Sequence, residues 1–134
     1  MNCAGDPERQ ISIVVADDHT VMRDGLRMLL QLQQDFEVVA EAGDIQSLFQ
    51  QMRAHQPMVL VLDLHMPGGS SVDAISALAR ISPVTAVVVL TMEDDRDVER
   101  AAYSAGASSY VRKEAAATDL VRAIRAAARK SLSG

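Results

Sequence analysis

Tryptophan is absent from this sequence, and cysteine and the other aromatic residues are scarce. The 134 residues include two Phe, two Tyr and one Cys, which is Cys3 near the start. So few aromatic side chains leave little surface for stacking nucleic-acid bases, and a formal net charge of −5 disfavours binding to a phosphate backbone. One cysteine cannot form a disulfide within the chain, so we expect a reducing, cytoplasmic location.

Long apolar runs are also missing. No run approaches the roughly 20 residues that a membrane-spanning helix needs, and the first ten residues lack the apolar segment of a signal peptide. We therefore expect no membrane partner. A chain of this length can form one domain with its own hydrophobic core, and we expect residues 1–10 to be a flexible N-terminus that precedes it.

Short apolar runs, rich in β-branched residues, predict five strands: Ile11–Ala16, Phe36–Ala40, Met58–Leu62, Thr85–Leu90 and Ala107–Val111. The first, third and fourth are apolar almost throughout, as in parallel strands that are covered on both faces. Segments of helical period separate the runs, at about 20–33, 44–54, 70–80, 94–104 and 115–130. Strict alternation of strand and helix predicts an α/β fold, a (βα)5 doubly wound parallel sheet with right-handed crossovers.

Individual residues mark the faces and ends of these helices. The first helix is expected to bury one apolar face, formed by Val21, Met22, Leu26, Leu29 and Leu30. Ser70 or Ser71 is a candidate N-cap of the third helix. Gly106 lies where a residue with positive φ commonly ends a helix, here the fourth.

Charged or hydroxyl residues follow four of the five predicted strands. Asp17 and Asp18 follow the first, Asp63 the third, Thr91 the fourth and Lys113 the fifth. All strands of a parallel sheet end at the same edge, where open α/β folds bind ligands. With the strand order 2-1-3-4-5, the three carboxylates meet where the connections diverge. The end of the second strand offers no obvious contribution.

Three carboxylates in one cleft repel each other, and a hard divalent cation relieves that repulsion. Mg²⁺ prefers oxygen ligands and binds through one or two carboxylates while keeping waters and substrate phosphate. Thr91 and Lys113 would then supply a hydroxyl and a positive charge to phosphoryl oxygens. Asp63 is the candidate nucleophile, because a carboxylate can accept a phosphoryl group as an acyl phosphate.

Each of these residues also has an ordinary structural explanation. Asp18 could cap a helix, Asp63 could stabilise a turn, Thr91 could cap the fourth helix and Lys113 could be a solvated charge. Taken singly, each residue fits either explanation. Their common position at one edge of the sheet favours the functional interpretation.

Four motifs contain these residues: "VVADDHT", "LVLDLHMPGG", "VVVLTMEDD" and "SSYVRKE". With them the chain resembles the receiver domain of two-component response regulators over residues 11–130. The segment "VVADDHTVMRDGLRMLL" is particularly similar to regulators of the NarL/LuxR type. The resemblance implies a flavodoxin-like fold and a cytoplasmic signalling switch that is not a turnover enzyme.

The resemblance also implies a role for each motif residue. Asp63 would receive a phosphoryl group from a sensor histidine kinase. Asp18, Asp63 and the backbone carbonyl of His65 would bind Mg²⁺ directly, and Asp17 would act mainly through a metal-bound water.

Thr91 and Tyr110 would propagate the signal, and Lys113 would help to hold the phosphoryl group. Thr91 and Lys113 would hold the phosphoryl oxygens, and Thr91 would move toward them. Tyr110 matches the switch aromatic that turns inward when the threonine moves. The resulting change would favour a homodimer and control transcription.

Departures from the family pattern leave alternatives open. Glu114 replaces the proline that often follows the lysine, so a cis peptide is not expected there. Residues 131–134 would begin a linker to a helix-turn-helix DNA-binding domain, and DNA would be bound only through that absent domain. A single-domain regulator and a pseudo-receiver for protein interaction are the alternatives. A Mg²⁺-dependent phosphohydrolase is disfavoured, because His65 stands where that class needs an acid and no cap-sized insertion exists.

Overall fold

The computed structural model describes residues 10–92 and 95–133. The expected flexible N-terminus therefore lies, except for Gln10, outside the described residues, as does Cys3. The elements follow in the order β1 (Ile11–Ala16), α1 (Thr20–Gln31), β2 (Phe36–Ala42), α2 (Ile45–His55), β3 (Val59–Asp63), α3 (Ser71–Ile81), β4 (Ala86–Thr91), α4 (Arg96–Ala105), β5 (Ser109–Arg112), the 3-10 helix η2 (Lys113–Ala115) and α5 (Ala116–Ser133).

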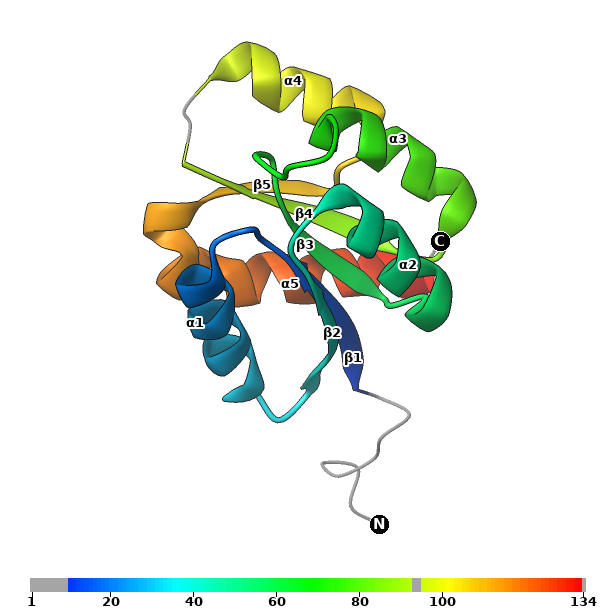
Figure 1. The fold of residues 1–134 in the computed structure, drawn as a ribbon. Helices are drawn as coiled ribbons and strands as arrows, with labels where there is room; N and C mark the ends of the chain where they lie inside the picture. The colour runs from blue at the N-terminus through cyan, green and yellow to red at the C-terminus, as the bar shows by residue number, and fades with distance from the viewer. Residues whose placement is uncertain (1–9, 93–94, 134) are drawn as a thin grey trace.

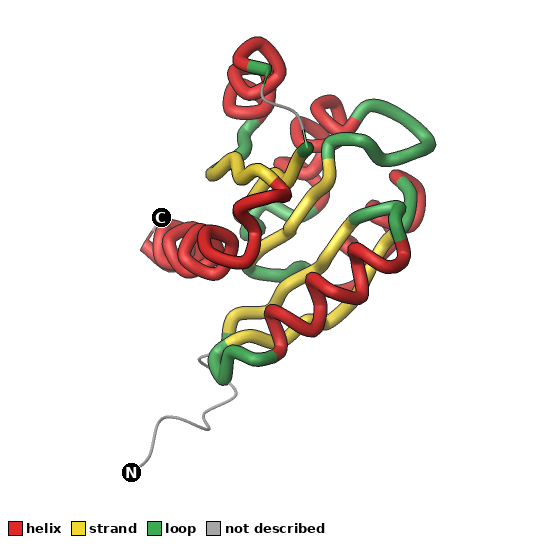
Figure 2. Tube along the Cα trace, turned by 90° about the vertical axis from the view of Figure 1, so that its left-hand side faces the viewer, coloured by secondary structure: helices red, strands yellow, loops and turns green. Residues whose placement is uncertain are grey.

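The strands form one parallel sheet in the order β2-β1-β3-β4-β5, which confirms the predicted fold and strand order. Helices α1 and α5 cover one face of the sheet, and α2, α3 and α4 cover the other (Figure 1). Turned by 90°, the same chain shows the strands enclosed between helices (Figure 2). Both faces of the sheet are therefore shielded from water.

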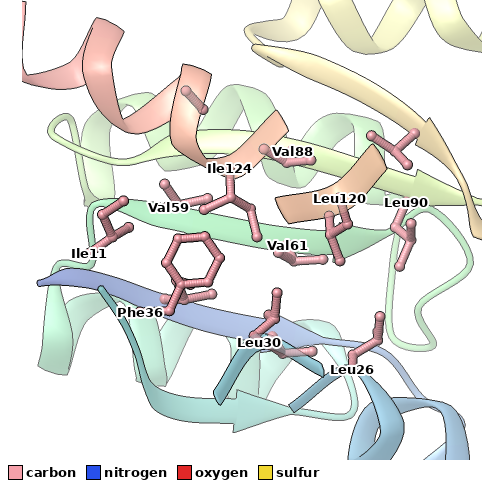
Figure 3. Packing of buried hydrophobic residues seen from close by; sticks show 14 of the residues in the cluster. Ile11, Leu26, Leu30, Phe36, Val59, Val61, Val88, Leu90, Leu120 and Ile124 are labelled. Carbon is pink, nitrogen blue, oxygen red and sulfur yellow. The ribbon is translucent and has the colours of Figure 1, made fainter. Parts of the chain in front are cut away.

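Two hydrophobic cores result from the twofold period of the strands. In β1, Ile13 and Val15 face the core beneath α1 and α5, whereas Val14 and Ala16 face the core beneath α2, α3 and α4. Strands β3 and β4 divide in the same way. In Figure 3, Leu26 and Leu30 of α1 and Leu120 and Ile124 of α5 lie over one side of the central strands. This explains why the central strands are apolar at nearly every position.

Several predicted strand boundaries are corrected. Strand β2 continues to Ala42, β5 runs from Ser109 to Arg112 instead of from Ala107 to Val111, and β3 and β4 lie one residue later than predicted. Asp63 pairs with Leu90 and therefore belongs to the ladder of β3 rather than to the loop that follows it. Polar residues such as Asp63 and Glu41 are part of these strands because their backbones pair with residues of the adjacent strands.

One predicted core residue is exposed. Val21 is 87% exposed, whereas Leu26 and Leu30 are buried and Met22 and Leu29 are partly buried. Five residues separate Val21 from Leu26, so the two side chains lie about 140° apart around the helix axis. A pattern of apolar residues alone could not show which of two adjacent stripes faces the sheet.

The helix ends follow the sequence signals closely. The Ser70 side chain caps α3 by accepting the N–H of Asp73 at 3.2 Å, which confirms one of the two candidates. Gly106 ends α4 with φ 124, as predicted. Helix α4 begins at Arg96, and the start predicted two residues earlier lies outside the described residues.

The end of the chain is more helical than predicted. Helix α5 extends to Ser133 and so includes residues 131–133, whose role as the start of a linker stays a prediction. The described residues contain no cis peptide bond, in agreement with the expectation at Glu114. None of the described helices is long and apolar enough to cross a membrane.

Hydrogen bonds between hydroxyl, amide and backbone groups close the amino-terminal edge of the sheet. The Thr85 hydroxyl donates to the Pro57 carbonyl at 2.5 Å and lies 2.6 Å from the Ser82 hydroxyl. The Gln56 side-chain amide donates to the carbonyl of Ile81 at 2.9 Å. These bonds join the segment before β3 to the segment before β4.

An arginine on α5 binds the loop before β2, also at the amino-terminal edge of the sheet. Arg125 donates to both carboxylate oxygens of Asp35, at 2.9 and 3.0 Å, and its guanidinium lies 5.1 Å from the centre of the Phe36 ring. The hydrogen bond from Arg125 lowers the pKa of Asp35 below its usual value. The pair fastens α5 to the start of β2.

Candidate functional site

The predicted site residues gather where β1 and β3 end. These two strands are neighbours, but the chain leaves β1 toward β2 on one side and reaches β3 on the other. This point is the topological switch of the sheet, where open α/β folds bind ligands. Asp17 follows β1 and is 0% exposed, Asp63 ends β3 and is 2% exposed, and Asp18 is exposed.

Lys113 bridges the two buried carboxylates. Its ammonium Nζ lies 3.0 Å from Asp17 Oδ2 and 3.2 Å from Asp63 Oδ2, and the side chain is 7% exposed. Burial lowers the pKa of Lys113, but the hydrogen bond to Asp17 and the charges of Asp63 and Asp17 outweigh it and raise the pKa above its usual value of 10.5. The ammonium is therefore charged at neutral pH, and Lys113 is not a solvated surface residue.

The Asp17–Asp18 turn does not cap α1 with an aspartate. The N-cap is His19, whose side chain makes no capping hydrogen bond. The His19 N–H donates to Asp17 Oδ1 at 2.9 Å, and its ring Nδ1 lies 3.3 Å from Asp17 Oδ1 and 3.1 Å from Asp18 Oδ1. The Asp18 carboxylate thus stays directed toward the other acidic groups, which argues against its interpretation as a helix cap.

The two carboxylate oxygens of Asp63 have different surroundings. Its Oδ1 accepts the N–H of His65 at 3.0 Å, so the turn-stabilising interpretation is partly correct. Its backbone carbonyl accepts a hydrogen bond from the buried Ser71 hydroxyl at 3.1 Å. These contacts hold the carboxylate in place, and Oδ2 is left facing Lys113. His65 itself is exposed.

Thr91 and Tyr110 lie on the two strands beyond β3. Thr91 is the last residue of β4 and is fully buried, one position after Leu90, the partner of Asp63. Tyr110 is partly buried on β5 and packs against the core beneath α2, α3 and α4. The structure thus brings Asp17, Asp18, Asp63 and Lys113 into contact range and places Thr91 and Tyr110 on the adjoining strands.

The acidic cluster fits a cation. One ligand atom from each of Asp17, Asp18, His19 and Asp63 can be chosen so that all lie within 4.8 Å of one another. The two buried carboxylates, Asp17 and Asp63, share the single ammonium of Lys113, so negative charge is in excess here. Carboxylate oxygens at such distances suit Mg²⁺. The donor set is therefore compatible with the expected metal.

Two arginines of α1 contribute to the surroundings of the site and were not predicted. Arg23 donates to the Asp17 carbonyl at 2.7 Å and to Glu41 at 3.0 Å, and Arg27 binds the same Glu41. The end of the second strand, which offered no obvious contribution, therefore supplies Glu41. A signal existed, because helical side chains point toward the N-terminus and Arg23 lies one turn after the aspartates.

Comparison with known proteins supports the resemblance to receiver domains. The family model of the response regulator receiver domain matches residues 13–125. The oxygen regulatory protein NreC of Staphylococcus epidermidis is 40% identical over 116 residues, covering 86% of this chain and 53% of that protein. NreC of Staphylococcus aureus is 41% identical over the same length and is covered to 54%. The chain thus spans about half the length of these relatives.

Solved structures show the same fold. A two-component response regulator of the LuxR family from Aurantimonas sp. SI85-9A1 superposes with a TM-score of 0.85 at 30% identity, covering 90% of this chain and 86% of that one. RcsB from Salmonella enterica serovar Typhimurium, bound to the promoter rprA, superposes with a TM-score of 0.80 at 30% identity. That match covers 87% of this chain and 67% of RcsB.

Proposed function

The chain belongs to the response regulator receiver family, in its NarL/LuxR-type branch, and on this premise we propose that Asp63 accepts a phosphoryl group from a phosphohistidine on a sensor histidine kinase. A carboxylate oxygen of Asp63 attacks phosphorus as the P–N bond breaks, which leaves an acyl phosphate on Asp63 and returns a neutral imidazole to the kinase after protonation. The observation that supports this proposal most strongly is the buried Asp63 carboxylate with the Lys113 ammonium 3.2 Å away.

The acidic residues would hold the metal that this reaction needs. Asp18, Asp63 and the backbone carbonyl of His65 would bind Mg²⁺, and Asp17 would do so through a water. Bound Mg²⁺ supplies positive charge that offsets the negative charge of the carboxylates and the incoming phosphoryl group. Asp17 is already held by His19 and Lys113, so little reorganisation of its carboxylate is needed.

Lys113, Thr91 and Tyr110 would connect phosphorylation to the rest of the domain. Lys113 would exchange its contact with the Asp63 carboxylate for one with a phosphoryl oxygen. The Thr91 hydroxyl would move toward another phosphoryl oxygen, and Tyr110 would turn inward into the space released. The acyl phosphate would thereby shift the equilibrium between two arrangements of an output face. The domain would act as a switch and not as a turnover enzyme.

The output we propose is transcriptional control from the cytoplasm. The match to this chain covers only about half the length of NreC, and the solved structure of RcsB is of that protein bound to a promoter. We infer that a C-terminal helix-turn-helix domain outside this chain binds DNA, and that phosphorylation favours a homodimer. The alternative is a pseudo-receiver that binds partners without phosphorylation. The buried arrangement of Asp17, Asp63 and Lys113 favours the phosphorylated switch.

Intact mass spectrometry tests this function directly. The chain is incubated with a small acyl phosphate donor and Mg²⁺, and we expect the mass of one phosphoryl group to be added. Asp63→Asn and removal of Mg²⁺ should each abolish the addition. Asp73→Asn, at an exposed position on α3, is the matched control and should be modified like the wild type. A wild-type chain that gains no phosphoryl group would establish the pseudo-receiver instead.

A further inference from the structure

Arg23 joins the end of β1 to the end of β2. Its Nη1 donates to the backbone carbonyl of Asp17 at 2.7 Å, and its Nε donates to Glu41 Oε1 at 3.0 Å. The backbone N–H of Asp17 donates to the carbonyl of Ala42 at 3.0 Å. The residue that leads into the acidic turn is therefore held to β2 at both its N–H and its carbonyl.

Arg27 provides a comparison one turn further along α1. It binds the other oxygen of the same carboxylate, with its Nε 3.1 Å from Glu41 Oε2. Arg27 is 36% exposed, whereas Arg23 is 20% exposed. Only Arg23 of the two has a hydrogen bond to Asp17. The two arginines thus share a partner and differ in their link to the site.

Gly43 leaves room for the Arg23 guanidinium. A Cβ at this position would lie 3.0 Å from Arg23 Nη1, the nitrogen that binds the Asp17 carbonyl. That distance is too short for a side chain to be added without moving the guanidinium. Gly25, on the same helix as Arg23, has nothing within 4 Å of its added Cβ. A methyl group at position 43 would therefore press on the Arg23 guanidinium and shift it by a few tenths of an ångström.

The Asp17 carbonyl controls where Asp18 points. Carbonyl and N–H groups on the two sides of a peptide bond lie in one plane, so the bond from Arg23 to the Asp17 carbonyl also sets the plane that leads to the Asp18 Cα. The Asp18 side chain is 33% exposed, and its Oδ1 lies 3.1 Å from Nδ1 of the His19 ring. Its direction therefore depends mainly on the backbone that Arg23 holds.

We propose that Arg23 is a positioning residue, which aims the Asp18 carboxylate into the metal site by clamping the Asp17 carbonyl to Glu41, while Gly43 keeps that clamp open. This inference rests on the proposed metal-dependent phosphoryl acceptance and extends it to residues that touch neither metal nor phosphoryl group. Arg is suited to this role, because its planar fork binds two acceptors in fixed directions.

Calorimetric titration of Mg²⁺ into the 134-residue chain tests the proposal. Groups that orient metal ligands typically change metal affinity 10- to 100-fold, so we expect Arg23→Gln to raise the Kd for Mg²⁺ about tenfold. Arg27→Gln loses the same partner without touching Asp17 and should stay within about twofold of the wild type. Arg23→Lys should give an intermediate value, since one ammonium cannot occupy both directions of the fork.

A glycine pair tests the same clamp without removing any charge. Gly43→Ala should displace the guanidinium and raise the Kd for Mg²⁺, whereas Gly25→Ala, in open space, should leave it unchanged. Gly43→Ala also keeps the proposal testable if Arg23→Gln does not fold. At saturating Mg²⁺, phosphoryl addition to Gly43→Ala should return to within about threefold of the wild type, because the defect lies in metal binding.

The outcomes separate this inference from the function on which it rests. A wild-type chain that binds no Mg²⁺ would overturn both. A wild-type chain that binds Mg²⁺, with Arg23→Gln and Gly43→Ala unchanged in Kd, would overturn the role of Arg23 alone. Equal weakening in Arg23→Gln and Arg27→Gln, in proportion to a loss in Tm, would show a merely structural contribution and would also overturn it.

Discussion

The two edges of the sheet use polar residues in opposite ways. At the amino-terminal edge, Thr85, Ser82 and Gln56 join loops through neutral hydrogen bonds. The ion pair of Arg125 with Asp35 at this edge is balanced in charge. At the carboxyl edge, the buried carboxylates of Asp17 and Asp63 face one ammonium, that of Lys113. Two negative charges and one positive charge leave this edge with a net negative charge inside the protein.

The difference indicates which edge is arranged for stability and which for binding. Neutral donors and acceptors that satisfy each other need nothing further. Asp17 Oδ2, by contrast, is buried 3.0 Å from the Lys113 ammonium, a single positive charge that it shares with the Asp63 carboxylate. Buried negative charge in excess of positive charge is unfavourable, and a bound cation would offset it. Substitutions at the two edges should therefore separate stability from phosphorylation.

The largest effect is expected for Asp18→Ala at the carboxyl edge. This change should abolish Mg²⁺-dependent phosphoryl addition, because it would remove one of the proposed direct ligands of the ion. Because the change also relieves repulsion among the clustered carboxylates, the free energy of unfolding should not fall when no Mg²⁺ is added. Intact mass and urea unfolding measure the two quantities. Phosphorylation that survives in this variant would contradict the metal-site assignment.

Lys113→Met should have the next largest effect, and it should act on stability as well. Without the ammonium, the carboxylates of Asp17 and Asp63 stay buried and uncompensated, and the free energy of unfolding should fall by about 3 kcal/mol at neutral pH. Millimolar Mg²⁺ should restore part of that loss, as measured by urea unfolding with and without the ion. Arg125→Met is the control, because its pair with Asp35 is 40% and 43% exposed and should contribute only about 0–1 kcal/mol.

The Lys113 contribution should also depend on pH. A group whose pKa is raised in the folded chain stabilises the fold below its unfolded pKa. For Lys113 that value is the usual 10.5, and the contribution should be lost as the pH rises through the higher folded pKa. Wild type and Lys113→Met should therefore converge in stability at strongly alkaline pH. A constant difference between them would contradict the ion-pair explanation.

The smallest effect is expected for Thr85→Val at the amino-terminal edge. The change removes the hydroxyl that joins Ser82 to the Pro57 carbonyl, and the free energy of unfolding should fall by about 1–2 kcal/mol. Phosphoryl addition should proceed at the wild-type rate once the variant is folded. A slower reaction at equal folded fraction would show that the two edges are coupled.

Much of the fold could be predicted because local pattern and tertiary environment agree. Nearly continuous apolar runs such as Val59–Asp63 indicate a strand covered on both faces, and the structure covers both faces of β3. The error at Val21 has a different origin. Val21 and Leu26 are both apolar and both helical, and only the docking of α1 on the sheet decides that one is 87% exposed and the other 3%.

The site shows the same division. Asp17, Asp18, Asp63 and Lys113 could be predicted to meet, because the strand order alone brings the ends of β1, β3 and β5 to one edge. The position of Arg23 one turn after the aspartates was a signal, but its pairing with Glu41 also depends on which face of α1 lies against β2. Neither residue follows directly from the alternation of strands and helices.

The sequence by itself determined the order of elements, the edge of the sheet where the charged residues collect, and the family to which the chain belongs. Those features depend on periodicity and on a few residues at strand ends. Only the tertiary structure decided that Lys113 lies between two buried carboxylates and that Arg23 holds the backbone behind them. The physical reason is that the distances in such contacts are set by how the helices and the loops after the strands pack on the sheet, whether the partners are 50 residues apart, as Lys113 and Asp63 are, or six, as Arg23 and Asp17 are.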